Sequence, residues 1–196
     1  MDKISYALGL GIGQQLKSMN ITGFSIEDFT KSIADVINGQ QTQMTAREAQ
    51  EMLNEYFATK AAEDAKKAIG EGKVFLENNG KRQGVVTTKS GLQYEVLTEG
   101  TGRSPKATDK VRCHYEGRLI DGTVFDSSYR RGEPATFPLR GVIRGWTEGL
   151  QHMAVGSKFR FYIPYQLAYG AQGAGGSIPP YAALIFDVEL LGIEGK

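Results

Sequence analysis

The residues with the clearest chemical potential lie between positions 115 and 186, where aromatic side chains surround one carboxylate. Asp126 directly follows Phe125 at the end of an apolar run, so its carboxylate can face the same apolar hollow as that ring. Trp146 opens a short helical stretch, and backbone N–H groups before a first helical turn are free to bind a carbonyl oxygen. The apolar residues that we assign to one pocket are Tyr115, Phe125, Phe137, Val142, Ile143, Trp146, Tyr169, Ile178 and Phe186.

These residues also have a simpler interpretation. Taken singly, each aromatic residue is typical of a hydrophobic core, because buried rings dominate protein interiors. Asp126 alone is typical of a turn whose side chain caps Ser127 and Ser128. Taken together, however, the rings are too many for one short helix to cover, and several lie at predicted loop edges, where pockets form. We therefore favour a binding pocket over a plain core.

The predicted pocket is poor in groups for covalent chemistry. The sequence offers no Ser-His-Asp arrangement, no second carboxylate at a useful spacing and no thiol beside a base. The two histidines, His114 and His152, do not gather the three or four ligands that zinc needs. We expect a site that binds a ligand, or catalyses a reaction without covalent chemistry, and that uses neither a metal nor a cofactor.

Composition narrows the classes of partner. Lys plus Arg number 23 against 22 for Asp plus Glu, so no charge excess points to nucleic acid or an anionic membrane. No apolar run approaches the roughly 18 to 20 residues of a membrane span, and the first residues do not resemble a signal peptide. The single Cys113 cannot form an internal disulfide. We expect a cytoplasmic protein.

The elements that position this pocket follow a helical region. Residues 4–19 and 25–36 each place apolar side chains on one helical face, and Ser25 is a predicted N-cap. A third helix is predicted from residue 45 to Asn79, with Thr45 and Glu48 as a capping box, and it would extend ~50 Å. Its bulky apolar residues lie in the first half, whereas the second half is rich in alanine and charge, which predicts a solvated connector.

The helical region needs a surface to cover its apolar faces, since small domains bury little of their own surface. A second copy of the chain would supply one, with Gly9, Gly11 and Gly13 allowing close helix approach. Folding back onto the C-terminal half is the alternative. The same glycines do not form a phosphate loop, because no strand precedes them and the spacing is wrong. We predict a dimerisation region at 1–44 and the long helix at 45–83.

From about residue 84 the apolar pattern changes to a period of two, which predicts antiparallel strands. Asp121-Gly122, between two short apolar pairs, indicates a hairpin. The only helix expected among these strands covers residues 146–153. The predicted fold is therefore α+β, with a curved antiparallel sheet wrapped over a short helix in residues 84–196. The alternating positions lie at Leu92, Tyr94 and Val96; at Val111, Cys113 and Tyr115; at Phe159, Phe161 and Ile163; and at Leu184, Phe186, Val188 and Leu190.

Several segments resemble the FKBP-type peptidyl-prolyl cis-trans isomerases, the immunophilins that bind the macrolide tacrolimus. The similarity spans roughly residues 90–193 in order and spacing. The helical front end further resembles the dimeric bacterial branch related to macrophage infectivity potentiator, which implies a V-shaped homodimer joined through the N-terminal helices. The segments concerned are Val111–Gly117, Gly122–Ser128, Val142–Leu150, Ala168–Ala171, Ile178–Pro180 and Leu184–Leu190.

The resemblance implies an isomerase of Xaa-Pro bonds in folding proteins, with chaperone-like capture of proline-containing, unfolded or partly folded polypeptides. The alternative is a non-catalytic, dimerising module that docks proline peptides. Arg131 stands where the family can pair a cation with Asp126, whereas Ala135 and Ala174 replace an aromatic residue and a histidine common in the family, which affects the expected affinity for tacrolimus-type macrolides. The implied catalytic residues are Tyr115, Phe125, Asp126, Ile143, Trp146, Tyr169 and Phe186, and the implied substrate contacts are Phe137, Val142 and Ile178.

Overall fold

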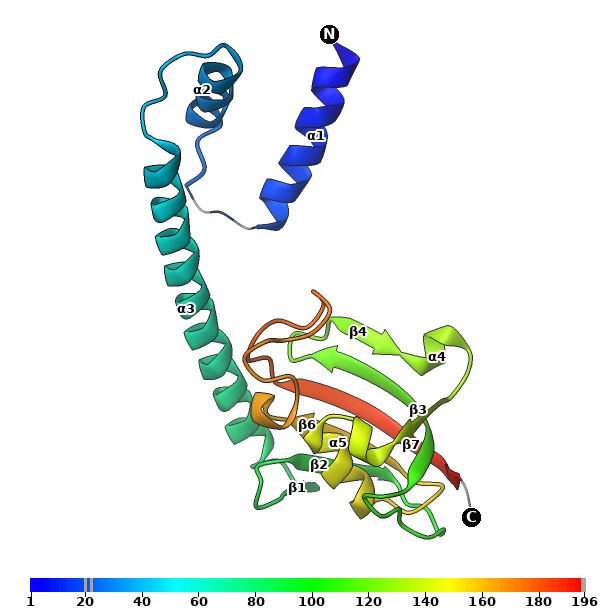
Figure 1. Cartoon of the computed structure of the whole chain (residues 1–196). Helices are drawn as coiled ribbons and strands as arrows, with labels where there is room; N and C mark the ends of the chain where they lie inside the picture. The colour runs from blue at the N-terminus through cyan, green and yellow to red at the C-terminus, as the bar shows by residue number, and fades with distance from the viewer. Residues whose placement is uncertain (20, 22, 195–196) are drawn as a thin grey trace. The chain divides into compact units, whose positions relative to one another are not determined.

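The computed structural model describes residues 1–19, 21 and 23–194 (Figure 1). These residues form two compact units, Met1–Tyr56 and Phe57–Lys196. The border lies inside the long helix, so the residue 84 boundary that the sequence predicts falls within the second unit. Among the described residues no helix is both long and apolar enough to cross a bilayer.

The first unit contains helices α1 (Lys3–Ser18) and α2 (Ile26–Ile37) and the start of α3 (Ala46–Asn79). The Ser25 hydroxyl accepts the Asp28 N–H at 3.2 Å, which confirms the predicted N-cap of α2. At the start of α3, the Thr45 N–H donates to Glu48 at 2.7 Å and the Glu48 N–H donates back to the Thr45 hydroxyl at 3.2 Å. The predicted capping box is therefore confirmed, because each side chain satisfies a backbone donor that the helix leaves free.

The second unit is built on a seven-stranded antiparallel sheet in the order β1-β2-β6-β7-β3-β4, with β5 paired to β3 (Figure 1). The predicted strands are confirmed, but two short ones, β1 and β5, were not expected, since three or four residues carry little periodic signal. The strand bounds are β1 Val85–Thr87, β2 Gln93–Thr98, β3 Lys110–Leu119, β4 Val124–Ser127, β5 Ala135–Pro138, β6 Lys158–Ile163 and β7 Leu184–Glu194.

The hairpin between β3 and β4 turns at Asp121-Gly122, as the sequence predicts. The Leu119 N–H donates to the Thr123 carbonyl at 2.9 Å, and Gly122 adopts a φ of 92°, which residues with a Cβ rarely reach. The Asp121 carboxylate accepts the Thr123 N–H at 2.8 Å, so the turn is held by backbone and side chain together.

The concave face of the sheet carries the core and is covered by helix α5 (Arg144–Gly149), which continues as the 3-10 turn η2 (Leu150–His152). The helix begins two residues earlier than the predicted 146–153 and tightens after Gly149. A Cβ at Gly145 would lie 2.5 Å from Ile163, and one at Gly149 would lie 2.6 Å from Phe161. These two glycines, four residues apart on one helical face, allow α5 to pack directly on β6.

The end of α3 packs within the same unit, while most residues between Lys60 and Lys73 are exposed. Gly72 and Asn79 are buried, and a Cβ at Gly72 would lie 3.3 Å from that of Ala183. The Asn79 side chain donates to that of Gln93 on β2 at 2.8 Å. The alanine-rich sequence hid this packing, because small side chains permit close approach as readily as they permit exposure.

Candidate active site

Trp146 lies at the centre of the predicted pocket. It projects from the first turn of α5, and only 4% of its surface is exposed. Three rings meet the indole edge to face, with interplanar angles of 88°, 85° and 82°; the centroid distances are 5.2 Å to Tyr115, 5.6 Å to Phe137 and 5.3 Å to Phe186. Edge-to-face contacts of this kind fix ring orientation as well as burying area. The indole is therefore held rigidly by its neighbours.

The wall beyond Phe186 depends on a glycine that the sequence interpretation did not single out. Phe125 meets Phe186 at a centroid distance of 5.5 Å and an angle of 81°. Gly117 on β3 pairs with Phe186 on one side and Asp126 on the other. A Cβ at Gly117 would lie 2.6 Å from the Phe186 ring and 2.7 Å from the Phe125 ring. Gly117 therefore makes room for both rings.

A charged network closes one edge of the pocket. The Tyr115 hydroxyl donates to Asp126 Oδ2 at 2.5 Å, and Arg131 Nη2 donates to the Tyr115 hydroxyl at 2.8 Å. Arg131 Nη1 also donates to Asp126 Oδ1, and the guanidinium carbon lies 5.5 Å from the centre of the Tyr115 ring. The Asp126 carboxylate is thus directed into this network.

The network sets the charge of its members. Burial opposes ionisation of the Asp126 carboxyl, but hydrogen bonds from Tyr115 and Arg131 outweigh it, so the pKa of Asp126 lies below its usual 3.8. Burial, followed by the bond to Asp126, raises the pKa of Tyr115 above its usual 10.0. Burial and the negative charge of Asp126 likewise raise the pKa of Tyr169. At neutral pH the site therefore holds one carboxylate and two neutral phenols.

Two serines that follow Asp126 hold the network in place. Ser127 is the N-cap of the short helix α4 (Ser128–Arg131), which returns Arg131 to the carboxylate. The fully buried Ser128 hydroxyl accepts the Tyr115 N–H at 2.7 Å and lies 3.2 Å from the Tyr115 carbonyl. Ser128 thus fixes the backbone of Tyr115, a role that sequence spacing alone does not reveal.

The remaining predicted residues lie around the same hollow. Val142 and Ile143 are half-buried against the core beside α5, and Ile178 is 8% exposed in the loop before β7. No hydrogen bond of the described residues uses the Ile143 backbone N–H, which precedes the first turn of α5. Tyr169 is 39% exposed and lies outside the buried cluster. The structure thus gathers the apolar residues closely and leaves Tyr169 at the margin.

The arrangement suits recognition more than bond breaking. Among the described residues no group of three or more His, Cys, Asp or Glu side chains could hold a metal ion. The one thiol, Cys113, is buried in the core, and burial raises its pKa to about 12. What the site does offer is a rigid aromatic surface, a fixed carboxylate at its edge and a backbone donor beside it.

Comparisons with known proteins show the family of the chain. The sequence profile described as "FKBP-type peptidyl-prolyl cis-trans isomerase" matches residues 101–191, and that of the "Domain amino terminal to FKBP-type peptidyl-prolyl isomerase" matches residues 1–96. The chain is 47% identical to the FKBP-type 22 kDa peptidyl-prolyl cis-trans isomerase of Escherichia coli K12, over 96% of this chain and 93% of that protein.

Two further relatives cover both units. Peptidyl-prolyl cis-trans isomerase Mip of Coxiella burnetii is 43% identical over 100% of this chain and 87% of that protein. The crystal structure of FkpA from Escherichia coli superposes with a TM-score of 0.77 at 37% identity, over 97% of this chain and 95% of that chain. With its aromatic pocket, its antiparallel sheet and its helical front end, the chain belongs to the FKBP-type peptidyl-prolyl cis-trans isomerase family of enzymes.

Proposed function

We propose that the Trp146 pocket accelerates rotation about Xaa-Pro bonds by stabilising the twisted amide without a covalent step. Rotation must cross a barrier of about 18–20 kcal/mol, because resonance holds the planar amide. In the twisted state the carbonyl is less polar, so an apolar pocket stabilises it relative to the planar form. Lowering the barrier by about 4 kcal/mol would give roughly a thousandfold acceleration. The observation that carries this proposal is the indole enclosed by three edge-on rings.

Each group at the pocket takes a distinct role in this proposal. The prolyl ring lies on Trp146, flanked by Tyr115, Phe125 and Phe186. The Ile143 N–H and the Tyr169 hydroxyl bind substrate carbonyls and hold the peptide in a turn, while Phe137, Val142 and Ile178 contact the flanking residues. In support, the Ile143 donor is unused within the described residues and Tyr169 stands at the exposed margin.

Asp126 acts through its charge in this proposal. Tyr115 and Arg131 already hold both carboxylate oxygens, and the lowered pKa keeps the group ionised. It therefore stabilises the electron-poor carbonyl carbon of the twisted amide electrostatically and transfers no proton.

The test is NMR exchange spectroscopy on a short Xaa-Pro peptide with wild type, Asp126→Leu and Trp146→Leu. We expect fast exchange with the wild type and at least about a tenfold loss in each variant, which corresponds to about 1.4 kcal/mol of barrier. Folded variants that keep the full rate would refute the assigned roles. Peptide binding without faster exchange would instead identify a non-catalytic docking module.

We also propose that the first unit forms a homodimer that captures proline-containing, partly folded polypeptides. Its support is the exposed apolar surface of this unit: α1 has no buried residue, and Ile4, Leu8 and Ile37 are 74%, 65% and 77% exposed. In a dimer the two pockets are linked, so a polypeptide bound at one pocket meets the second pocket at a raised effective concentration. A monomeric variant should therefore keep its rate on short peptides yet refold a proline-limited protein more slowly.

Two finer proposals concern ligands and location. The pocket would take a tacrolimus-type macrolide, with affinity limited by Ala135 and Ala174; titration calorimetry with the wild type and the Trp146→Leu variant tests this. The cytoplasmic location stays a prediction from composition, and cell fractionation with antibody detection tests it.

A further inference from the structure

The loop that precedes β7 carries two of the proposed substrate contacts, Tyr169 and Ile178, and we call residues 169–183 the substrate loop. Its tip is tied internally, because the Ala174 N–H donates to the Ile178 carbonyl at 2.9 Å and the Ile178 N–H donates back at 3.0 Å. A Cβ at Gly173 would collide with the Ile178 carbonyl oxygen, so the tip closes tightly on itself. The place of Ile178 at the pocket therefore depends on how the base of the loop is held.

The base of the substrate loop holds a residue in an unfavourable conformation. Among the described residues other than glycine, only Tyr181 has a positive φ, at 59°. Residues with a Cβ avoid this left-handed region, so the surroundings must hold Tyr181 there. Its N–H donates to the Gly170 carbonyl at 2.9 Å, and its ring meets that of Tyr165 edge to face, with the centroids 5.3 Å apart. These contacts join the two ends of the loop to each other.

Helix α3 fixes the joined ends within the unit, through a residue without a side chain. The loop lies beside the C-terminal turns of α3 (Figure 1), where Ala183, two residues after Tyr181, is 4% exposed. A Cβ at Gly72 would lie 3.3 Å from the Ala183 Cβ and 4.0 Å from its backbone nitrogen. The base of the loop thus packs directly on helix backbone. Glycine weakens a helix relative to alanine, but here it permits this close contact.

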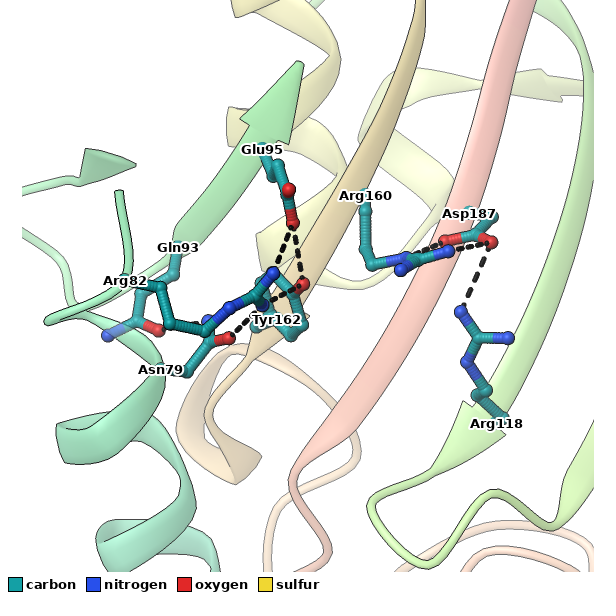
Figure 2. A network of polar contacts seen from close by, with 8 residues as sticks. All are labelled: Asn79, Arg82, Gln93, Glu95, Arg118, Arg160, Tyr162 and Asp187. Atoms are coloured by element: carbon teal, nitrogen blue, oxygen red, sulfur yellow. Dashed lines mark hydrogen bonds and ion pairs between the residues drawn. The ribbon is translucent and has the colours of Figure 1, made fainter. Parts of the chain in front are cut away.

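The helix is in turn bonded to the sheet by a partly buried polar network at its C-terminal end (Figure 2). The Gln93 side-chain amide donates to the Leu76 carbonyl, in the last turn of α3, at 2.9 Å. Arg82 Nη1 donates to the Asn79 side chain at 2.8 Å and to the Tyr162 hydroxyl at 2.9 Å. These bonds reach both β2 and β6, so the helix backbone that meets the loop has a fixed position relative to the sheet.

We propose that Gly72 is a positioning residue of the enzyme. By letting α3 touch Ala183, it keeps Tyr181 in its left-handed conformation. It thereby places Tyr169 and Ile178 at the margin of the pocket, and the inference rests on the substrate-binding roles proposed for these two residues. Such contacts hold the peptide equally in its planar and twisted forms, so a displaced loop weakens peptide binding without slowing the rotation step. The signature is a raised KM with an unchanged kcat.

The test compares Gly72→Leu with Gly70→Leu in the full chain. Leucine favours a helix more than glycine does, so both variants keep α3. A Cβ at Gly70 would meet nothing within 4 Å, which makes Gly70→Leu the matched control. NMR exchange spectroscopy over a range of Xaa-Pro peptide concentrations gives kcat and KM. We expect Gly72→Leu to raise KM about tenfold and to keep kcat within about twofold of the wild type, while Gly70→Leu keeps both constants.

A smaller substitution and its rescue cover the case in which Gly72→Leu does not fold. Gly72→Ala should raise KM about twofold. Combining it with Ala183→Gly should restore KM, because a single Cβ again separates helix and loop. Urea unfolding of each variant measures stability separately. A merely structural role for Gly72 would change the free energy of unfolding but leave the KM of the folded variant unchanged.

Three outcomes would overturn the inference: folded Gly72→Leu with the wild-type KM, a loss of kcat as large as the rise in KM, or no rescue of Gly72→Ala by Ala183→Gly. Tyr169→Phe and Ile178→Ala separate this failure from failure of the proposed function. If both keep the wild-type KM, the roles proposed for the loop are wrong and the inference fails with them. If both raise KM while Gly72→Leu does not, only the positioning role fails.

Discussion

The two units of the chain carry apolar side chains of similar types, but one unit buries them and the other exposes many of them. In Phe57–Lys196, side chains such as Leu150 and Phe161 are fully buried. In Met1–Tyr56, helices with equally regular apolar patterns leave Leu8 and Ile37 mostly exposed. Periodicity thus predicts which face of an element favours burial, but it does not say whether the covering surface belongs to the same chain.

The largest expected effect comes from comparing the substitution of one leucine in each unit, a buried one and an exposed one. Leu150→Ala should lower the free energy of unfolding by about 2–5 kcal/mol, because it opens a cavity in a filled core. Leu8→Ala should leave the unfolding of the second unit unchanged. Urea unfolding followed by circular dichroism at two protein concentrations measures both. A Leu150→Ala effect no larger than that of Leu8→Ala would contradict the comparison.

The next effect concerns space inside the second unit. Gly117→Ala should lower the free energy of unfolding by about 1–3 kcal/mol, since the added Cβ displaces the Phe125 and Phe186 rings. The Xaa-Pro exchange rate should fall about tenfold, because these rings flank the indole. The matched control is Gly192→Ala on β7, whose added Cβ would meet nothing within 4 Å. An unchanged rate in folded Gly117→Ala would remove the role given to this glycine.

A third prediction tests what covers the exposed helices. Leu8→Glu should weaken self-association at least tenfold, about 1.4 kcal/mol, by placing a charge on the apolar face. Gln14→Glu adds the same charge to an exposed position off this face and should associate like the wild type. Sedimentation equilibrium gives both constants. A monomeric wild type would show that the apolar face has another partner.

The smallest expected effect is an absence of pH dependence. The pKa of Asp126 is lowered below 3.8 and that of Tyr115 is raised above 10.0, so neither titrates between about pH 5 and 8. A carboxyl pKa that is lower in the folded than in the unfolded state stabilises the fold at pH values above the unfolded pKa. This stabilisation is lost as the pH falls through the folded pKa. The exchange rate should stay constant across the window. A titration step that vanishes in Asp126→Asn would contradict the lowered pKa.

Local signals made much of the fold predictable. The caps at Ser25 and Thr45, the Asp121-Gly122 turn and the alternating strands each depend on residues near one another in the sequence. The aromatic pocket was predictable from the same alternation, together with a family resemblance. The roles of Gly117 and Ser128 were not, because they depend on which strand lies opposite and how closely. The packing of α3 on the sheet escaped prediction for the same reason.

The rigid enclosure of Trp146 has a practical consequence. It is the only tryptophan in the chain, and within the described residues its buried indole nitrogen has no hydrogen-bond partner. Fluorescence excited selectively from tryptophan therefore comes from the aromatic pocket around Trp146 alone, free of any background from the N-terminal helices. A change in its emission on adding a peptide reports occupancy of the site without a label, so the enzyme carries its own optical probe.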